Sequence, residues 1–314
     1  MYPTRDALEG YNPEGSSNDG SLSDAVLEDA GPCAWHKGLT MKDDPRQSYV
    51  LGHGSEEHRR LMLQSRFVGE LTEAVFARAG LASGMRVLDV GCGAGDVSLL
   101  AAAFVGAGGS VLGIDQSPES VSLARERAKA AGLDNVRFEV ARLEEFRGEG
   151  PFDALVGRLV LLYLKEPAAV VKQLAERVRP GGVIVFHEME MTTARCVPES
   201  PLWTQTGRWI VEAFTRAGVE TSMGSRMYSI FEDAGLAPPE MISGGRVEGN
   251  PESQIFEWLA QTVRSLLPMI EKTGVATRDE VGIDTLADRL RAAVVEKRGV
   301  AHSPIFVGAW TRKK

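Results

Sequence analysis

Cysteine is scarce in this sequence, which has only three among its 314 residues. An odd number of cysteines without a C-x-x-C pair provides neither a disulfide framework nor a thiolate zinc site. The five histidines are scattered, and no cluster of His and Asp accompanies them, so we expect no metal site. These few unpaired thiols indicate the reducing cytoplasm as the expected location.

Long apolar runs and an excess of positive charge are also missing. No apolar stretch reaches the roughly 18 residues that a membrane-spanning helix needs. The N-terminus MYPTRDALEG is neither basic nor apolar, so we expect no signal peptide. The net charge is −8, and no Lys/Arg-rich run is interleaved with aromatic residues. We therefore expect neither nucleic acid nor a membrane as a partner.

The first part of the chain differs in composition from the rest. Residues 1–45 are poor in apolar side chains, and the stretch NPEGSSNDGSLSD is typical of a flexible segment. Trp35 and His36 stand side by side within it. We interpret residues 1–45 as an N-terminal extension, either a flexible arm or a lid over the main domain, which would comprise residues 46–314.

Strand and helix patterns alternate regularly in the middle of the sequence. Buried apolar runs predict strands that are separated by helical patterns and by Gly or Pro at the boundaries. The strands are expected at 85–90, 110–115, 135–141, 152–157 and 183–188, with helices at 94–106, 118–131 and 167–179. Such alternation predicts a doubly wound, Rossmann-like α/β fold in which helices cover both faces of a parallel sheet.

Further helical patterns flank this core. One runs from Ser55 to Gly80, and others fall within 190–221, at 226–235, 252–272 and 283–298, with strands at 240–247 and 303–310. We expect the insertions near 190–221 and 250–300 to cap the ligand-binding edge. Some of their large apolar side chains should line a pocket for the acceptor of the reaction. The candidates are Trp203, Trp209, Phe214, Met223, Met227, Tyr228, Phe231 and Trp258.

The stretch VLDVGCGAGD, residues 87–96, joins the first strand to a helix. Its glycines give G-x-G-x-G, and Asp96 stands where the dinucleotide fingerprint has its last glycine. A second acid, Asp89, lies inside the strand. Two carboxylates around such a loop would repel a pyrophosphate but favour an ammonium or sulfonium group. The loop therefore favours a cationic adenosine compound and makes a dinucleotide oxidoreductase a poor alternative.

Residues 85–188 resemble the core of the class I S-adenosylmethionine-dependent methyltransferases. The predicted strand order fits that fold, with a mostly parallel seven-stranded sheet, through residue 314. The resemblance implies that S-adenosylmethionine is the cofactor and that the loop, with Asp89, Gly91, Cys92 and Gly93, contacts it. RPGG followed by VIVFHE is similar to the segment that precedes the family's fifth strand.

The resemblance also assigns the nucleoside contacts. Asp115, at the end of the second strand, matches the acid that accepts from both ribose hydroxyls, and Gln116 would lie against the adenine ring. Where the family often has an aspartate after strand three, this chain has Arg142, which cannot accept a hydrogen bond. Adenine recognition would then use backbone groups of Arg142 and Leu143.

GRLVLLY (157–163) and YVLGHG (49–54) are similar to a bacterial small-molecule branch of the family. This similarity implies that Arg158 and Tyr49 reach the methionine end of the cofactor, with Arg158 placed for its carboxylate. Gln64 on the first helix is a further candidate. The expected acceptor is a small molecule, and a homodimer is compatible with the sequence.

Methyl transfer to oxygen or nitrogen also raises the question of a general base. His187, Glu188 and Glu190 lie at the end of the fifth strand, and the two acids share a face if the chain stays extended. If that face turned toward the cleft it would favour a cationic or amine acceptor; otherwise the acids would cap loops or pair with Arg195. His53 and His36 are candidate bases on the lid.

The leading hypothesis is methyl transfer to an O or N atom of a small molecule in specialised metabolism, mainly by positioning of the acceptor. The alternatives are another reaction with the same cofactor, such as cyclisation or decarboxylation, and a non-catalytic regulatory protein that binds the cofactor.

Overall fold

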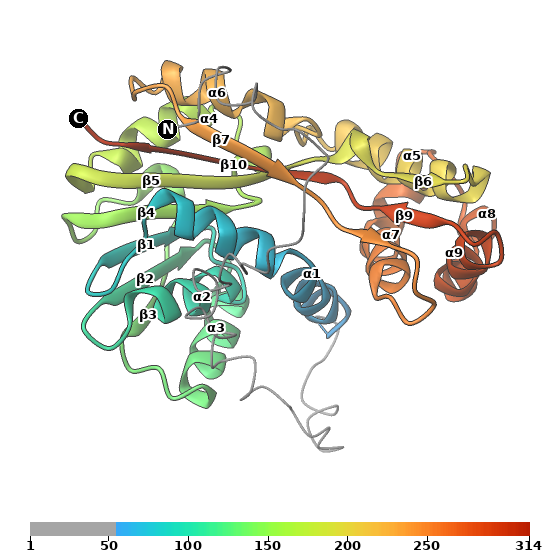
Figure 1. Cartoon of the computed structure of the whole chain (residues 1–314), viewed down its shortest axis with the longest axis horizontal. Coiled ribbons are helices and arrows are strands. Elements are labelled where there is room, and N and C mark those ends of the chain that lie inside the picture. Colours follow the sequence, from blue (N-terminus) through green and yellow to red (C-terminus); the bar gives the residue numbers. More distant parts are fainter. Residues whose placement is uncertain (1–54) are drawn as a thin grey trace, which may run out of the picture. The chain divides into compact units, whose positions relative to one another are not determined.

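A seven-stranded sheet organises the chain in the computed structural model, which describes residues 55–314 (Figure 1). Its strand order is β3-β2-β1-β4-β5-β10-β7, and β10 alone runs antiparallel to its neighbours in this sheet. The strands are β1 (Arg86–Val90), β2 (Ser110–Asp115), β3 (Val136–Val140), β4 (Phe152–Arg158), β5 (Val178–Glu190), β7 (Glu240–Gly244) and β10 (Ile305–Arg312). This confirms the predicted mostly parallel, Rossmann-like α/β fold.

Helices cover both faces of this sheet (Figure 1). One face carries α1 (Ser55–Ala79), α2 (Asp96–Val105) and α3 (Pro118–Ala130), and the other carries α4 (Pro167–Ala175) and α6 (Met223–Asp233). Local sequence explains where they begin: the Ser117 hydroxyl accepts from the Ser120 N–H, and Pro118 occupies the first turn of α3. The 3-10 turns η4 (Leu143–Glu145) and η5 (Leu161–Tyr163) follow β3 and β4.

The RPGG segment behaves differently from the prediction. The helix expected at 167–179 ends at Ala175, and β5 begins at Val178 instead of 183. The pairing of β5 with β4 shifts register here. Val178 pairs with Phe152 and Val183 with Ala154, so β5 has extra residues between these two pairs. A Cβ at Gly182 would lie 2.8 Å from the Asp153 carbonyl oxygen, so glycine permits the bulge.

A second group of elements lies at one end of the large sheet, and we call it the cap (Figure 1). It contains a small sheet, β6-β9-β8, that the sequence did not reveal. Its members are η6 (Met191–Thr193), β6 (Arg195–Val197), α5 (Pro201–Arg216), β8 (Val247–Glu248), α7 (Ile255–Lys272), α8 (Arg278–Val281), η7 (Ile283–Thr285), α9 (Leu286–Val295) and β9 (Val300–His302). The strand expected at 240–247 is divided between the two sheets.

Two of the joints between the cap and the large sheet lie side by side. Gly245 and Arg246 separate β7 from β8, and Ser303 and Pro304 separate β9 from β10. The joints bind each other: the Arg246 N–H donates to Ser303 Oγ at 2.9 Å, and the Ser303 N–H donates to the Arg246 carbonyl oxygen at 2.9 Å. The two strands thus pass side by side from one sheet into the other.

The buried side chains form two hydrophobic cores, one around the large sheet and one in the cap, to which Phe67 and Val68 of α1 and Phe306 of β10 also belong. Leu159, Met189 and Phe214 pack against both cores and connect them. Within 55–314 the helices are too short or too polar to span a bilayer. The predicted extension 1–45 lies outside the described residues.

Candidate functional site

The glycine loop after β1 owes its shape to three residues with positive φ. Gly91, Gly93 and Gly95 have φ of 66°, 52° and 86°, a region that favours glycine. A Cβ at Gly91 would lie 2.4 Å from Val160 Cγ2, and one at Gly95 would lie 3.0 Å from Ala124 Cβ. A Cβ at Gly93 would meet nothing within 4 Å. The outer glycines therefore permit close packing, and the middle one faces open space.

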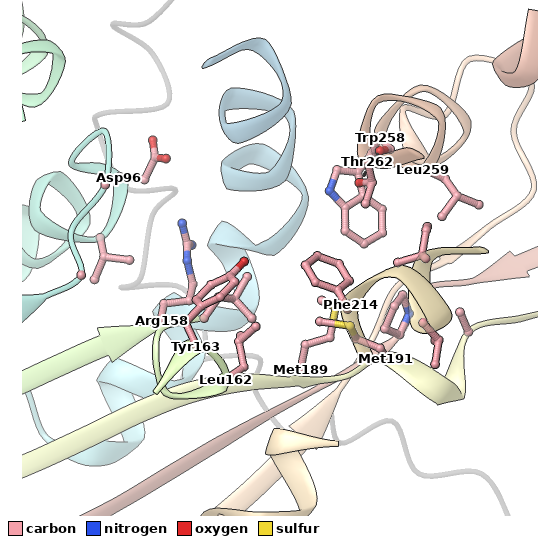
Figure 2. A pocket seen from close by; sticks show the side chains of 18 of the residues that line it. Asp96, Arg158, Leu162, Tyr163, Met189, Met191, Phe214, Trp258, Leu259 and Thr262 are labelled. Atoms are coloured by element: carbon pink, nitrogen blue, oxygen red, sulfur yellow. Dashed lines mark hydrogen bonds between the residues drawn. The ribbon is translucent and has the colours of Figure 1, made fainter. Parts of the chain in front are cut away.

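That open space is a cavity of about 260 Å³ between the loop and the cap (Figure 2). At one end it is lined by the glycine loop, Asp96 and Arg158. At the other end its lining is almost entirely apolar, and it includes Met189, Met191, Ile210, Phe214, Trp258 and Leu259. The cavity lies beyond the carboxyl ends of β1 and β4, where doubly wound sheets bind their ligands.

Asp115 ends β2 directly beside the loop. Its carboxylate accepts from the Gly93 N–H at 2.9 Å through Oδ2 and from the Ser117 N–H at 2.9 Å through Oδ1. A carboxylate oxygen has more than one acceptor site, so both oxygens keep capacity for hydroxyl donors. These contacts fix the carboxylate at the edge of the loop. Asp115 does not line the cavity, so its role as a ribose-binding acid stays a prediction.

The other residues expected near the nucleoside lie at the same edge of the sheet. Gln116 follows Asp115, and Arg142 and Leu143 follow β3, the neighbour of β2. Arg142 forms an exposed ion pair with Glu145, and Leu143 is buried. None of these three residues lines the cavity, so their contact with adenine stays a prediction.

Asp89 lies beneath the loop and is fully buried, without lining the cavity. Its Oδ2 accepts from Ser98 Oγ at 2.5 Å, and its Oδ1 has no partner within the described residues. Burial raises the pKa of this carboxyl to about 7, although the Ser98 hydrogen bond and the charge of Arg158 oppose the shift. Cys92 does line the cavity, and burial raises the pKa of its thiol, which makes it a poor nucleophile.

Arg158, at the end of β4, projects into the cavity between Asp96 and the apolar end (Figure 2). Its Nη1 donates to Thr72 Oγ1 at 3.2 Å. In the described part of the chain no carboxylate forms an ion pair with it, because Asp96 is paired with Arg127 at 2.6 Å. Desolvation lowers the pKa of Arg158, while Asp96 and Asp89 oppose this. A half-buried guanidinium without a carboxylate partner is suited to bind one from a ligand.

The face of β5 that turns to the cavity carries Met189 and neither of the two acids. Side chains alternate along a strand, and Met189 points into the cavity (Figure 2) while Glu188 and Glu190 share the other face. Glu188 Oε1 instead accepts the backbone N–H groups of Val160 and Leu161, at 2.9 and 2.8 Å. The two acids therefore do not face the cleft, and of the two alternatives the structure shows loop capping for Glu188, which holds the turn after β4.

Glu190 and His187 also contact polar side chains of the protein instead of facing the cavity. Glu190 accepts from the Ser225 hydroxyl at 2.6 Å and from the Thr192 hydroxyl at 3.2 Å, and Arg195 is not among its partners. His187 is buried outside the cavity, with Nδ1 3.1 Å from Thr72 Oγ1. Burial and the charge of Arg158 lower its pKa to about 3, so it stays neutral. His187 thus reaches Arg158 only through Thr72, and its expected place as a base in the cleft is wrong.

Burial of Glu188 has a testable consequence for stability. Desolvation raises its pKa in the fold to about 8, from an ordinary value of 4.5. The fold therefore holds a proton that the unfolded chain releases, and stability falls as the pH rises from about 4.5 to about 8. Glu188→Gln removes this pH-dependent part of the stability and keeps a side-chain oxygen that can accept from the Val160 and Leu161 N–H groups. Urea unfolding at pH 5 and pH 9 should show a smaller loss of stability in the variant, and an equal loss would contradict the buried-charge explanation.

Several residues predicted for the site lie outside the described part of the chain, and other lining residues were not predicted. Tyr49, His53 and His36 lie outside the described residues, as does the side chain of Gln64, whose backbone lies in α1. Of the large apolar residues expected at the acceptor pocket, Phe214 and Trp258 line the cavity. The others are buried in the cores or, for Tyr228, exposed. Met189, Met191 and Gly207 were missed; alternation with the acids of β5 was the available signal for the two methionines.

Comparison with known proteins decides the family. A family model described as a methyltransferase domain matches residues 81–235. The ubiquinone biosynthesis O-methyltransferase of Bordetella bronchiseptica is 30% identical over 190 residues, which cover 59% of this chain and 74% of that protein. This chain belongs to the class I S-adenosylmethionine-dependent methyltransferases. It is an enzyme whose cofactor is S-adenosylmethionine.

A second relative of this methyltransferase bears the same name, and two solved structures share its fold. The ubiquinone biosynthesis O-methyltransferase of Acinetobacter baumannii is 30% identical over 192 residues, covering 59% of this chain and 76% of that one. A putative methyltransferase from Bacillus halodurans has a TM-score of 0.52 at 18% identity, covering 76% of this chain and 97% of that structure. The YcgJ protein of Bacillus subtilis has a TM-score of 0.50 at 18% identity, with 82% and 100% covered. These two structures support the fold alone.

Proposed function

We propose that this methyltransferase methylates a hydroxyl oxygen of a flat, largely apolar small molecule held between the glycine loop and the cap. The observation that carries the proposal is the apolar end of the cavity, next to the loop. The names of the relatives support oxygen as the acceptor atom over nitrogen. A role in specialised metabolism stays a prediction from the sequence.

The donor end of the cavity fits the cofactor. S-adenosylmethionine, when bound, supplies a methyl group that its sulfonium sulfur has already activated. In our proposal Gly93 leaves room for it, Asp115 accepts from the ribose hydroxyls, and Arg158 binds the methionine carboxylate. The loop and the cap then have two tasks, which are to hold the acceptor oxygen in line and to exclude water.

The charges around the cavity narrow the class of acceptor. Within the described residues, Asp96 and Arg158 are the charged members of the lining, and both lie at the donor end. The acceptor end therefore offers a cation no counter-charge, which disfavours an amine. This described lining also holds no histidine or glutamate that could remove a proton. An acceptor hydroxyl that ionises readily, such as a phenol, fits better than an aliphatic alcohol.

Gly207 provides a variant that tests the acceptor pocket. This glycine lies inside α5 and lines the cavity, and a Cβ there would meet nothing within 4 Å. Leucine favours a helix more than glycine by roughly 0.5–1 kcal/mol, so Gly207→Leu should not lower the free energy of unfolding. Its side chain would, however, occupy the cavity. We expect turnover to fall at least tenfold, with cofactor affinity unchanged.

The experiment is a screen with methyl-labelled S-adenosylmethionine. Phenols, aliphatic alcohols and aryl amines are offered to the wild type and to Gly207→Leu, and labelled product is counted. Methylation of phenols that is lost in the variant would support the proposal. Preference for amines, or equal turnover by the variant, would overturn the assignment of this cavity to a phenolic acceptor.

A further inference from the structure

The hydroxyl of Thr72 on α1 meets two side chains of the large sheet. Thr72 is 0% exposed, and its Oγ1 lies 3.2 Å from Arg158 Nη1 and 3.1 Å from His187 Nδ1. Arg158 and His187 are paired across β4 and β5, so their side chains leave the sheet on the same face. The third neighbour of Oγ1 is the Val68 carbonyl oxygen, 3.1 Å away on the preceding turn of α1. One hydroxyl thus joins two strands to the helix that covers them.

The hydrogen bonds of this hydroxyl follow from its one proton and two lone pairs. Arg158 can only donate, so its N–H takes one lone pair of Oγ1. The Val68 carbonyl oxygen can only accept, so the hydroxyl proton goes there, as it often does for threonine within a helix. His187 then donates from Nδ1 to the second lone pair. If the hydroxyl donated to His187 instead, two oxygens would lie 3.1 Å apart without a proton between them.

The contact with Thr72 fixes the Arg158 guanidinium without neutralising its charge. A carboxylate in place of the hydroxyl would also hold the guanidinium, but it would compete with a ligand carboxylate. The hydroxyl takes one of the five N–H donors of the guanidinium, and a bidentate carboxylate contact needs two. A long side chain that is oriented before the ligand arrives loses less conformational entropy on binding. Thr72 therefore prepares Arg158 for an anionic ligand group.

We propose that Thr72 is a positioning residue for the methyl donor: its hydroxyl, itself held by the His187 N–H, orients the Arg158 guanidinium toward the carboxylate of S-adenosylmethionine. This inference rests on the proposed function, since it needs Arg158 to bind that carboxylate. Arg158 lines the cavity, whereas Thr72 and His187 do not. Both residues therefore act on the cofactor through Arg158.

Thr72→Val tests this role, because valine keeps the shape of threonine and lacks the hydroxyl. We expect the affinity for S-adenosylhomocysteine to fall about tenfold in isothermal titration calorimetry. The affinity for 5′-methylthioadenosine, which has no amino-acid end, should be unchanged. Thr72→Ser retains the hydroxyl and should restore most of the lost affinity. Equal losses for both ligands in Thr72→Val, or a serine variant as weak as the valine variant, would overturn the inference.

Thr206→Val is the matched control. Thr206 is also 0% exposed within a helix, and its hydroxyl donates to the Leu202 carbonyl oxygen one turn earlier, at 2.8 Å. It does not line the cavity. The same substitution there removes a buried helical hydroxyl, so it may be compared directly for thermal stability, and it should leave both ligand affinities as in the wild type.

A double-mutant cycle separates a failure of the inference from a failure of the proposed function. In Arg158→Met, adding Thr72→Val should weaken S-adenosylhomocysteine no further, because the hydroxyl acts only through the guanidinium. If Arg158→Met weakens this ligand and Thr72→Val does not, or if the two losses add, the inference is overturned while the role of Arg158 stands. If Arg158→Met itself has no effect, the carboxylate contact in the proposed function fails, and the inference fails with it.

The tautomer of His187 gives a readout that needs neither ligand nor turnover. The chain has five histidines, so the His187 ring signals are those that remain when the other four are replaced. Because burial lowers its pKa to about 3, the ring should stay neutral between about pH 5 and pH 8. Two-bond ¹⁵N–¹H spectra should show its proton on Nδ1. A proton on Nε2, or a ring that titrates in this range, would overturn the inference.

Discussion

Replacing Arg158 with methionine is expected to weaken S-adenosylhomocysteine binding about 100-fold, or roughly 3 kcal/mol. The guanidinium lies in the cavity without a carboxylate partner among the described residues, held by Thr72. A ligand carboxylate would meet it with charge-assisted hydrogen bonds in a partly desolvated place, where such contacts are strongest. Methionine keeps much of the side-chain volume. Isothermal titration calorimetry of both proteins measures the difference.

A second ligand distinguishes the loss of the Arg158–carboxylate contact from a general disruption of the cofactor site. 5′-Methylthioadenosine lacks the amino-acid end, so its affinity should be unchanged in Arg158→Met. Asp115→Asn, by contrast, should weaken both ligands at least tenfold, because both carry the ribose hydroxyls. Arg137→Met removes an exposed arginine that is paired with Glu149, and it should change neither affinity. Equal losses for both ligands in Arg158→Met would show that Arg158 does not bind the carboxylate.

Gly91→Ala should mainly lower the free energy of unfolding, whereas Gly93→Ala should mainly lower the affinity for the cofactor. Gly91→Ala places a methyl 2.4 Å from Val160 Cγ2 at a φ of 66°, so both strain and overpacking apply. We expect it to lower the free energy of unfolding by about 3 kcal/mol. Gly93→Ala meets no neighbour and should cost only about 1 kcal/mol of stability. Its methyl would occupy the cofactor's space, so affinity should fall at least tenfold.

The control for positive φ is Gly84→Ala. Gly84 has φ of 84°, its Cβ would also meet nothing within 4 Å, and it does not line the cavity. Its stability loss should resemble that of Gly93→Ala, with cofactor affinity retained. Thermal unfolding and calorimetry on the three variants give both quantities. Equal cofactor affinity in Gly84→Ala and Gly93→Ala would remove Gly93 from the proposed binding surface.

The sheet and the loop were predictable because their signals are local. Apolar runs bounded by Gly and Pro mark each strand, and the order of strand, glycine loop and helix places Asp115 beside Gly93. Residues far apart in sequence then meet because parallel strands end at one edge. The place of Arg158 follows from the same rule, since it ends β4 next to β1.

The orientation of β5 was not predictable from the same signals. A shift of one residue exchanges the two faces of a strand, and whether Glu188 or Met189 met the cavity depended on packing across the sheet. The small sheet escaped notice because β6, β8 and β9 are two or three residues long and too short to show alternation.

The paired joints at Arg246 and Ser303 bear on how the molecule unfolds. Because β7 leads into β8 and β9 into β10, the hydrogen bonds between the joints hold together two of the connections between the cap and the large sheet. Leu159, Met189 and Phe214, shared between the two cores, would be exposed if the cap separated from the large sheet. We therefore expect donor site and cap to unfold as one cooperative unit, in which a ligand that binds at either end slows amide hydrogen exchange at both.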